Sequence, residues 1–340
     1  MSKFPLEVLK RYVYPYTVGK HSDPAVVLGS TFGEDVAVTR VGEDLLLSHV
    51  DPIVGAVKGI GWLAVHVACN DIAASGVRPR WIQLLVMVPS ANDVEQVERI
   101  MSDAARAAES LEITIIGGHT GYSSGLERPL VAVTALAPAE GRRVVTTGGA
   151  EPGDLVYVTR GIGLEGTGIL ASDFTEEALS RGLGKRDIED ALKLLESVSV
   201  VTEALELSDL GATAMHDVTR GGILETFLEI GSCSGVCMDI DASALPVPPV
   251  VMRFAEAFGF DPLKMISSGT LAVTLPPESA EEAEKRFAKG LCDLKQVGVV
   301  TEGKGVCLRE EGKNRIFTEM ACEEDELARM WELLAPRYSC

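Results

Sequence analysis

Short apolar runs alternate with longer stretches of helical periodicity in the first half of the chain. The short runs predict strands, at 44–50, 82–88, 113–118 and 129–137. The third of these strands is expected to stop at a double glycine. The longer stretches carry apolar residues at helical spacing and predict helices, at 59–75 and 94–111.

Turn-forming residues gather around Gly149, and a similar alternation starts again after them. Strands are predicted at 155–159, 236–241, 269–275 and 295–300, and a further strand is predicted within ATAMHDVTRGG, residues 212–222. A glycine-rich turn is expected after the first of them. Helical segments are predicted at 175–207, from Ile223 onward, at 250–258 and at 279–289. We therefore expect an α+β protein with an N-terminal domain over 1–148, a C-terminal α/β domain over 149–313 and a helical tail over 314–340.

The composition of the chain limits the kinds of molecule that the protein can bind. The 340 residues carry a formal net charge of −19, which argues against nucleic acid and anionic membranes because both attract basic surfaces. No apolar stretch reaches the roughly 18–20 residues of a membrane span, and the N-terminus lacks the apolar region of a signal peptide. We expect a cytoplasmic protein. Such an acidic chain can still bind a polyphosphate if metal ions bridge the two sets of charge.

The cysteines do not indicate a structural zinc site. Cys233 and Cys237 are spaced C-x-x-x-C, but no second pair accompanies them, and the five histidines lie elsewhere. We interpret the thiols as buried or incidental. Cys340, the last residue, is treated separately below.

Four polar stretches place short oxygen ligands at the end of a predicted element or at a turn. They are GEDVAV with Asp35, HVDPIVG with Asp51, CNDIAASG with Asn70 and Asp71, and HDVTRGG with Asp217. Magnesium prefers such ligands and leaves other positions to substrate phosphates. Each stretch taken singly also fits a turn or a helix cap.

Two glycine loops accompany these acids. They are IIGGHTG, residues 115–121, and DVTRGG, residues 217–222. The second is followed by a predicted helix, whose first N–H groups favour anions, and Arg220 adds a fork-shaped cation. The same residues also fit an alternative interpretation, a tight turn that requires glycine. Neither loop matches the P-loop or the dinucleotide-binding fingerprint.

The motifs together resemble the aminoimidazole ribonucleotide synthetase (PurM-like) superfamily. They follow one another in the order GEDVAV, VDPIVGA, GWLAVHVACNDIAASGVRPRW, IIGGHT, MHDVTRGGILETFLE, SALPVPPVV and SSGTLAVTL. The superfamily includes thiamine-monophosphate kinase, selenophosphate synthetase and the hydrogenase maturation protein HypE. DVTRGG and SALPVPPVV look most similar to the HypE branch.

The resemblance implies a two-domain subunit whose N-terminal mixed sheet pairs with that of a second copy in a homodimer. It also implies Mg-ATP in a cleft between the domains. By motif position, the metal ligands would be Asp35, Asp51, Asp71 and Asp217. Asp71, Asp217 and His119 would be the catalytic residues. The nucleotide and its phosphates would meet a further set: Lys58, Asn70, Gly117, Gly118, Thr120, Thr219, Arg220, Gly221 and Gly222.

Several positions depart from the HypE branch. His119 replaces an acid, Gly121 stands where a lysine is usual, and Ser268-Gly269 replaces Glu-Gly. The branch ends in Pro-Arg-Ile-Cys, whose cysteine carries the carbamoyl group, whereas this chain ends APRYSC with the thiol of Cys340 one residue further on. His119 is open to two interpretations, a metal or phosphate ligand or a cap of the glycine turn.

Three functional hypotheses remain. The first is an Mg-ATP-dependent enzyme that phosphorylates a small-molecule acceptor or activates it with phosphate. The second is a nucleotide-binding maturation factor without turnover that acts through a partner protein. The third is hydrogenase maturation with Cys340 as carrier, against which a frayed terminus with an incidental cysteine has to be weighed.

Overall fold

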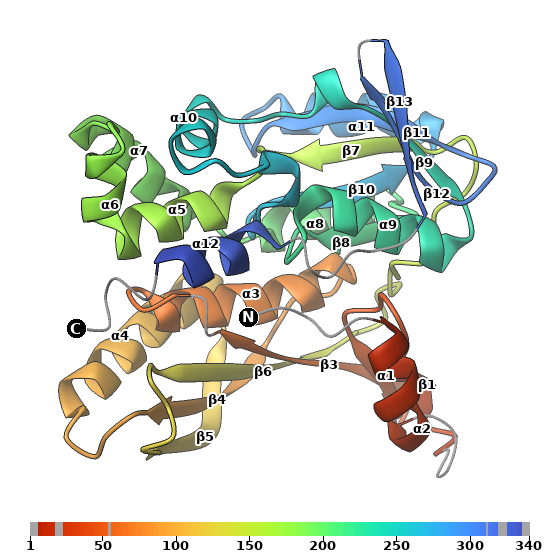
Figure 1. The fold of residues 1–340 in the computed structure, drawn as a ribbon. Helices are drawn as coiled ribbons and strands as arrows, with labels where there is room; N and C mark the ends of the chain where they lie inside the picture. The colour runs from red at the N-terminus through yellow and green to blue at the C-terminus, as the bar shows by residue number, and fades with distance from the viewer. Residues whose placement is uncertain (1–5, 18–22, 54–55, 311, 319–324, 335–340) are drawn as a thin grey trace.

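The computed structural model describes residues 6–17, 23–53, 56–310, 312–318 and 325–334. Two mixed layers of sheet and helix make up the molecule, one above the other, with helix α3 (Ile60–Ala74) between them (Figure 1). The observed fold is α+β with two domains, as the sequence predicts.

The N-terminal half is built on a six-stranded sheet of order β1-β2-β3-β6-β4-β5. Its neighbours are antiparallel except for the parallel pair β4–β5. The elements other than α3 are α1 (Leu6–Tyr12), α2 (Tyr14–Thr17), β1 (Val26–Leu28), β2 (Ala37–Val41), β3 (Asp44–Ile53), β4 (Trp81–Val88), α4 (Val94–Leu111), β5 (Thr114–Tyr122) and β6 (Leu130–Pro138).

Helix α3 is the central element of the molecule. It is apolar on nearly every side, and all its residues except Trp62 are buried. One side packs on β3 and β6, another on α4, and the opposite side meets the C-terminal half at α8 and β8. A Cβ on Gly61 would lie 2.1 Å from the carbonyl oxygen of Ile100, so this glycine permits the close crossing of α4.

The other face of the N-terminal sheet carries apolar side chains that no described element of the chain covers. Val50 is 61% exposed, Leu85 38% and Ile116 48%. These residues come from β3, β4 and β5. An apolar sheet face of this kind is a common place for a second chain to pack.

The C-terminal half is built on a seven-stranded sheet of order β13-β12-β9-β11-β7-β10-β8, in which β12–β9 is the parallel pair. Its strands are β7 (Leu155–Thr159), β8 (Ala214–Asp217), β9 (Cys237–Asp241), β10 (Leu271–Leu275), β11 (Leu294–Thr301), β12 (Gly305–Glu310) and β13 (Lys313–Phe317). Its α-helices are α5 (Leu164–Asp173), α6 (Thr175–Ser180), α7 (Lys185–Leu194), α8 (Val201–Asp209), α9 (Gly222–Ser234), α10 (Pro249–Phe258), α11 (Pro277–Phe287) and α12 (Glu326–Leu334). Short 3-10 turns are η1 (Leu195–Ser197), η2 (Ala242–Ala244) and η3 (Pro262–Lys264).

Strands β7, β8 and β10 of this sheet are buried on both faces. Along β7, Val156 and Val158 belong to an apolar cluster with Phe227 of α9, whereas Tyr157 belongs to the larger cluster that includes Phe287 of α11. The larger cluster continues through α8 into α3 and the N-terminal sheet. The two halves therefore share a continuous core, which fixes their relative position.

Three local predictions differ from the structure. The strand predicted at 113–118 does not stop at its double glycine, since β5 continues to Tyr122. Gly118 lets the backbone of β5 come close to Leu84, whose carbonyl oxygen would lie only 1.9 Å from a Cβ at this position. The glycine-rich turn after β7 contains helix α5, whose Gly166 packs against Met265. The tail predicted to be helical includes strand β13 as well as helix α12 in its described part.

A search of the described residues finds no helix with the length and apolar character needed to cross a membrane. The cysteines of the described part are free thiols: Cys69, Cys233, Cys237, Cys292 and Cys307. Cys322 and Cys340 lie outside the described residues, as do Pro336 and Arg337.

Candidate active site between the two halves

A cavity of about 310 Å³ lies where the two halves meet. Its polar and charged lining residues are Asp35, His49, Asp51, Asp71, Glu165, Thr219, Arg220 and Asp325. Its apolar lining residues are Pro52, Ile53, Val67, Ile266, Leu327, Ala328 and Trp331. The cavity therefore offers both charged and apolar contacts to a ligand.

The acids of this site come from separate elements. Asp35 precedes β2, Asp51 lies in β3, Asp71 lies in the last turns of α3, and Asp217 ends β8. Asp217 is completely buried behind the cavity. In the described part of the chain, one group of three side chains brings its metal-ligating atoms within 4.8 Å of one another: Asp35, His216 and Asp217.

Strong electrostatic coupling distinguishes this cluster. Burial raises the pKa of Asp71 well above its usual range, and the charges of Asp217, Asp35 and Asp51 raise it further. Its Oδ2 lies 3.3 Å from Nε2 of His49. The ionised form of Asp71 is therefore energetically unfavourable until a nearby cation neutralises the negative charge.

His216 is the internal counter-charge of the cluster. Burial alone would lower its pKa, but the nearby carboxylates of Asp35, Asp217 and Glu229 raise it well above the usual value. Its Nε2 lies 2.9 Å from Glu229 and its Nδ1 lies 3.4 Å from Asp35. We infer that His216 is an imidazolium, which stabilises the acids but does not itself bind a metal.

The donor set fits a hard divalent cation. Both carboxylate oxygens of Asp217 are buried and accept no hydrogen bond from the described residues, although the imidazole of His216 lies 3.7 Å from one of them. Buried polar atoms are rarely left in this state unless an ion or water supplies the missing contact. With Asp35, Asp51 and Asp71 beside it, the site offers several carboxylate ligands, which magnesium prefers over softer donors.

The turn between β8 and α9 lies beside the acids. Thr219 and Arg220 line the cavity. Gly221 and Gly222 follow with φ of 76° and 65°, and a Cβ on Gly222 would meet the backbone carbonyl oxygen of Leu263 at 2.5 Å. Both glycines are therefore required by the turn, which presents the first N–H groups of α9 next to Arg220.

Helix α12 lines the cavity with Leu327, Ala328 and Trp331. Trp331 packs edge-on against Phe174 with ring centroids 4.7 Å apart, and the guanidinium of Arg128 lies 4.4 Å from its ring. The indole is thus held between the two halves of the molecule. A fixed aromatic ring beside a cavity is a suitable contact for a planar group.

Other predicted site residues lie outside this cavity. Gly117, Gly118, His119 and Thr120 line a separate surface hollow along the edge strand β5. Lys58 donates a hydrogen bond from Nζ to the carbonyl oxygen of Ser172, 2.8 Å away, at the end of α5. One copy of the chain does not bring these residues to the acids.

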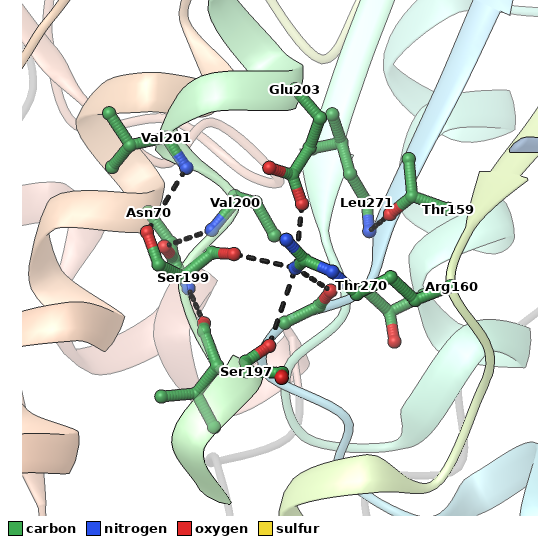
Figure 2. A network of polar contacts seen from close by, with 12 residues as sticks. Asn70, Thr159, Arg160, Ser197, Ser199, Val200, Val201, Glu203, Thr270 and Leu271 are labelled. Atoms are coloured by element: carbon green, nitrogen blue, oxygen red, sulfur yellow. Dashed lines mark hydrogen bonds and ion pairs between the residues drawn. The ribbon is translucent and has the colours of Figure 1, made fainter. Parts of the chain in front are cut away.

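Asn70 does not line the cavity, although its neighbour Asp71 does. Its amide nitrogen donates to the carbonyl oxygen of Val198 at 2.8 Å, and its amide oxygen accepts from the N–H of Val200 at 2.9 Å (Figure 2). The side chain is completely buried. Asn70 therefore holds the C-terminal half against α3 rather than facing the cavity.

Arg160 extends this connection to the next strand. Its Nη1 donates to the carbonyl oxygens of Ser199 and Gly269 at 2.6 and 2.9 Å, and it pairs with the buried Glu203 at 2.7 Å (Figure 2). Arg160 has a φ of 52°, an uncommon conformation for a residue other than glycine. The network joins α3 to the segment before β10.

Three groups of the site were not identified from the sequence. His216 precedes Asp217 within one motif, and the neighbouring acid was the available signal. His49 lies two residues before Asp51 in β3, so the two-residue repeat of a strand places both on one face. Glu165 was missed because helix α5 was interpreted as a turn.

The sequence matches the family described as AIR synthase related protein, with its N-terminal domain at residues 33–139 and its C-terminal domain at residues 151–309. Carbamoyl dehydratase HypE from Rhodobacter capsulatus is 31% identical over 255 residues, which cover 73% of this chain and 68% of that protein. The chain belongs to the AIR synthase related family.

Solved structures with the same fold include HypE. One is the HypE–HypF complex, with a TM-score of 0.74 and 21% identity over 92% of this chain and 99% of that chain. Another is HypE in complex with ATP, with a TM-score of 0.70 and 20% identity over 95% of this chain and 96% of that chain. These similarities establish the PurM-like two-domain fold.

Replacing Asn70 with alanine tests its structural position. Asn70→Ala would leave a buried carbonyl and a buried N–H unpaired, so we expect the free energy of unfolding to fall by about 2–4 kcal/mol in urea denaturation. The matched variant Asn92→Ala changes an exposed asparagine and should alter stability by less than about 0.5 kcal/mol. A loss below about 1 kcal/mol in Asn70→Ala would contradict this assignment.

The raised pKa of Asp71 predicts a pH dependence of stability without divalent cations. Folding raises the pKa of Asp71 above its value of 3.8 in the unfolded chain. The protonated carboxyl therefore contributes to stability below pH 3.8, and this contribution is lost as the pH rises through the pKa of the folded state. In EDTA, Asp71→Asn should therefore become more stable relative to wild type as the pH rises from 4 to 8. Thermal unfolding across this range measures the difference, and parallel curves would contradict the electrostatic assignment.

Proposed function

We propose that this protein binds Mg-ATP in the cavity and transfers phosphate to a small-molecule acceptor, or activates the acceptor by transient phosphorylation. The observation that carries this proposal is the convergence of Asp35, Asp51, Asp71 and Asp217 on one place where Asp217 lacks hydrogen-bond partners. The ATP complex of HypE, which has the same fold, supports the choice of nucleotide.

The residues of the cavity would have distinct roles. Asp35, Asp51, Asp71 and Asp217 would hold magnesium, which when bound neutralises phosphate charge and orients the transferred group. Arg220 would bind phosphate oxygens with its fork of N–H donors, beside Thr219. Trp331 would pack against the nucleotide base.

We infer a cytoplasmic homodimer formed through the uncovered face and edge of the N-terminal sheet. The exposed apolar residues Val50, Leu85 and Ile116 support this face. A second copy would also explain how residues 117–120 of β5, which lie away from the acids of their own chain, contribute to a site.

A second candidate is a nucleotide-binding maturation factor that acts through a partner protein and does not turn over ATP. The absence of the usual lysine at Gly121 and glutamate at Ser268 favours it. The structure of HypE bound to HypF shows that a protein of this fold can have a protein partner. The carbamoyl-carrier hypothesis depends on Cys340, outside the described residues.

Isothermal titration with ATP, with and without Mg²⁺, tests the proposed ligand. We expect binding by the wild type in Mg²⁺ that is lost in EDTA, and an affinity at least about tenfold weaker in Asp71→Asn, equivalent to about 1.4 kcal/mol. A matched variant, Asp103→Asn, lies on the outer face of α4 away from the cavity and should bind like wild type. Binding that is independent of metal would contradict the proposal.

Phosphate release distinguishes the two candidates. An enzyme should release phosphate from ATP above background, and the rate should rise with the correct acceptor. A pure binder should show Mg-ATP affinity without any release.

A further inference from the structure

Glu165 is a carboxylate in the cavity that belongs to none of the acidic motifs. It is the second residue of α5, it lines the cavity, and only 2% of its surface is exposed. Long acidic side chains are almost never buried this fully unless they are paired. Its position therefore calls for a specific explanation.

The first turn of α5 is tied to the segment before β10. The N–H of Leu164 donates to Oγ of Ser267 at 2.9 Å, and the N–H of Gly166 donates to the carbonyl oxygen of Ile266 at 3.1 Å. Glu165 Oε2 accepts from the N–H of Ser268 at 3.4 Å. Because the helix start and this segment are joined on both sides of Glu165, the carboxylate has little freedom to leave the cavity.

The same segment is connected to α3, on which Asp71 lies. Arg160 binds the carbonyl oxygens of Gly269 and Ser199, and Asn70 binds the neighbouring Val198 and Val200 (Figure 2). This path fixes Glu165 of the C-terminal half relative to Asp71 of the N-terminal half. Such rigidity is what a reacting group requires to act on a bound ligand.

The charges around Glu165 bring its titration close to neutral pH. Its pKa is raised to about 7, mainly by burial and also by the charge of Asp51 on β3, against the opposing effects of hydrogen bonds from Ser268 and of the charge of Arg220 before α9. Asp35 and Asp71 line the same cavity, and Asp325 does so just before α12. A carboxylate in this state can both accept and release a proton under physiological conditions.

We propose that Glu165 is a catalytic residue of the cavity that receives the proton of the acceptor group during phosphoryl transfer. This role rests on the proposed function. The acceptor oxygen forms a bond to phosphorus as its O–H bond breaks, and the proton goes to a carboxylate oxygen of Glu165. The bond from phosphorus to the leaving nucleotide oxygen breaks, and the nucleotide leaves with that electron pair.

The central test replaces Glu165 with its isostere. Glu165→Gln keeps an oxygen that can accept from Ser268 but cannot take up a proton at neutral pH. With water as the acceptor, we expect ATP turnover to fall by about 10²-fold or more, while affinity for Mg²⁺ and a non-hydrolysable ATP analogue stays within about threefold, or about 0.7 kcal/mol. Glu177→Gln is the matched control, because Glu177 is a mostly buried glutamate paired with Arg181 outside the cavity, and it should retain wild-type turnover.

A second readout does not depend on activity. In protein labelled with ¹³C at the glutamate carboxyl carbon, one resonance of the nucleotide-free wild type should titrate near neutral pH and disappear in Glu165→Gln. The acidic limb of the turnover profile should disappear in the same variant. A purely structural glutamate would produce neither change.

The outcomes separate this role from the proposed function. If the wild type does not bind the analogue in Mg²⁺, the proposed function itself is overturned. If the wild type binds it and turns over ATP, and Glu165→Gln does so equally well, only the role of Glu165 is overturned. Binding without turnover in the wild type would support the non-catalytic candidate and overturn this role.

Discussion

Repulsion between buried carboxylates is the constraint on which the arrangement of this molecule depends. Asp35, Asp51, Asp71 and Asp217 lie close enough for three of these charges to raise the pKa of the fourth, Asp71. In a medium less polarisable than water such repulsion is much stronger than at a surface. His216 compensates part of it, and the remaining negative charge makes the cavity a place that favours a divalent cation.

The fold can maintain this unfavourable cluster because the halves share one apolar core around α3. Residues of α3 contact the N-terminal sheet, α8 and β8, so the acids of one half cannot separate from Asp217 without opening that core. Asn70 and Arg160 add a polar connection across the same boundary. The packing of the apolar core thus offsets the repulsion and holds the charged groups in a geometry that they would not adopt alone.

The sequence predicted the parts of this site that depend on local pattern. Asp35, Asp51 and Asp71 line the cavity, and the charge of Asp217 acts on Asp71. Asp35 precedes β2 and Asp217 ends β8, as their motifs indicate, whereas Asp51 and Asp71 lie within β3 and α3, near the ends of these elements. The sequence could not show that residues 117–120 lie apart from these acids, because their location depends on the position of β5 at the edge of the sheet. Glu165 could not be identified from the sequence either, because the glycines around it in α5 indicate a turn. Only the close packing of these glycines against Met265 and Leu195 explains why they lie in a helix.

The most direct test of the central claim is the location of a divalent cation in the intact protein. Crystals of the full chain grown with Mn²⁺ and a non-hydrolysable ATP analogue would reveal the metal by its anomalous scattering. The account predicts manganese in the cavity, within coordination distance of Asp71 and at least one of Asp35, Asp51 and Asp217, with the phosphates on its open side. Manganese confined to surface carboxylates, with the cavity acids uncoordinated at saturating concentrations, would contradict it.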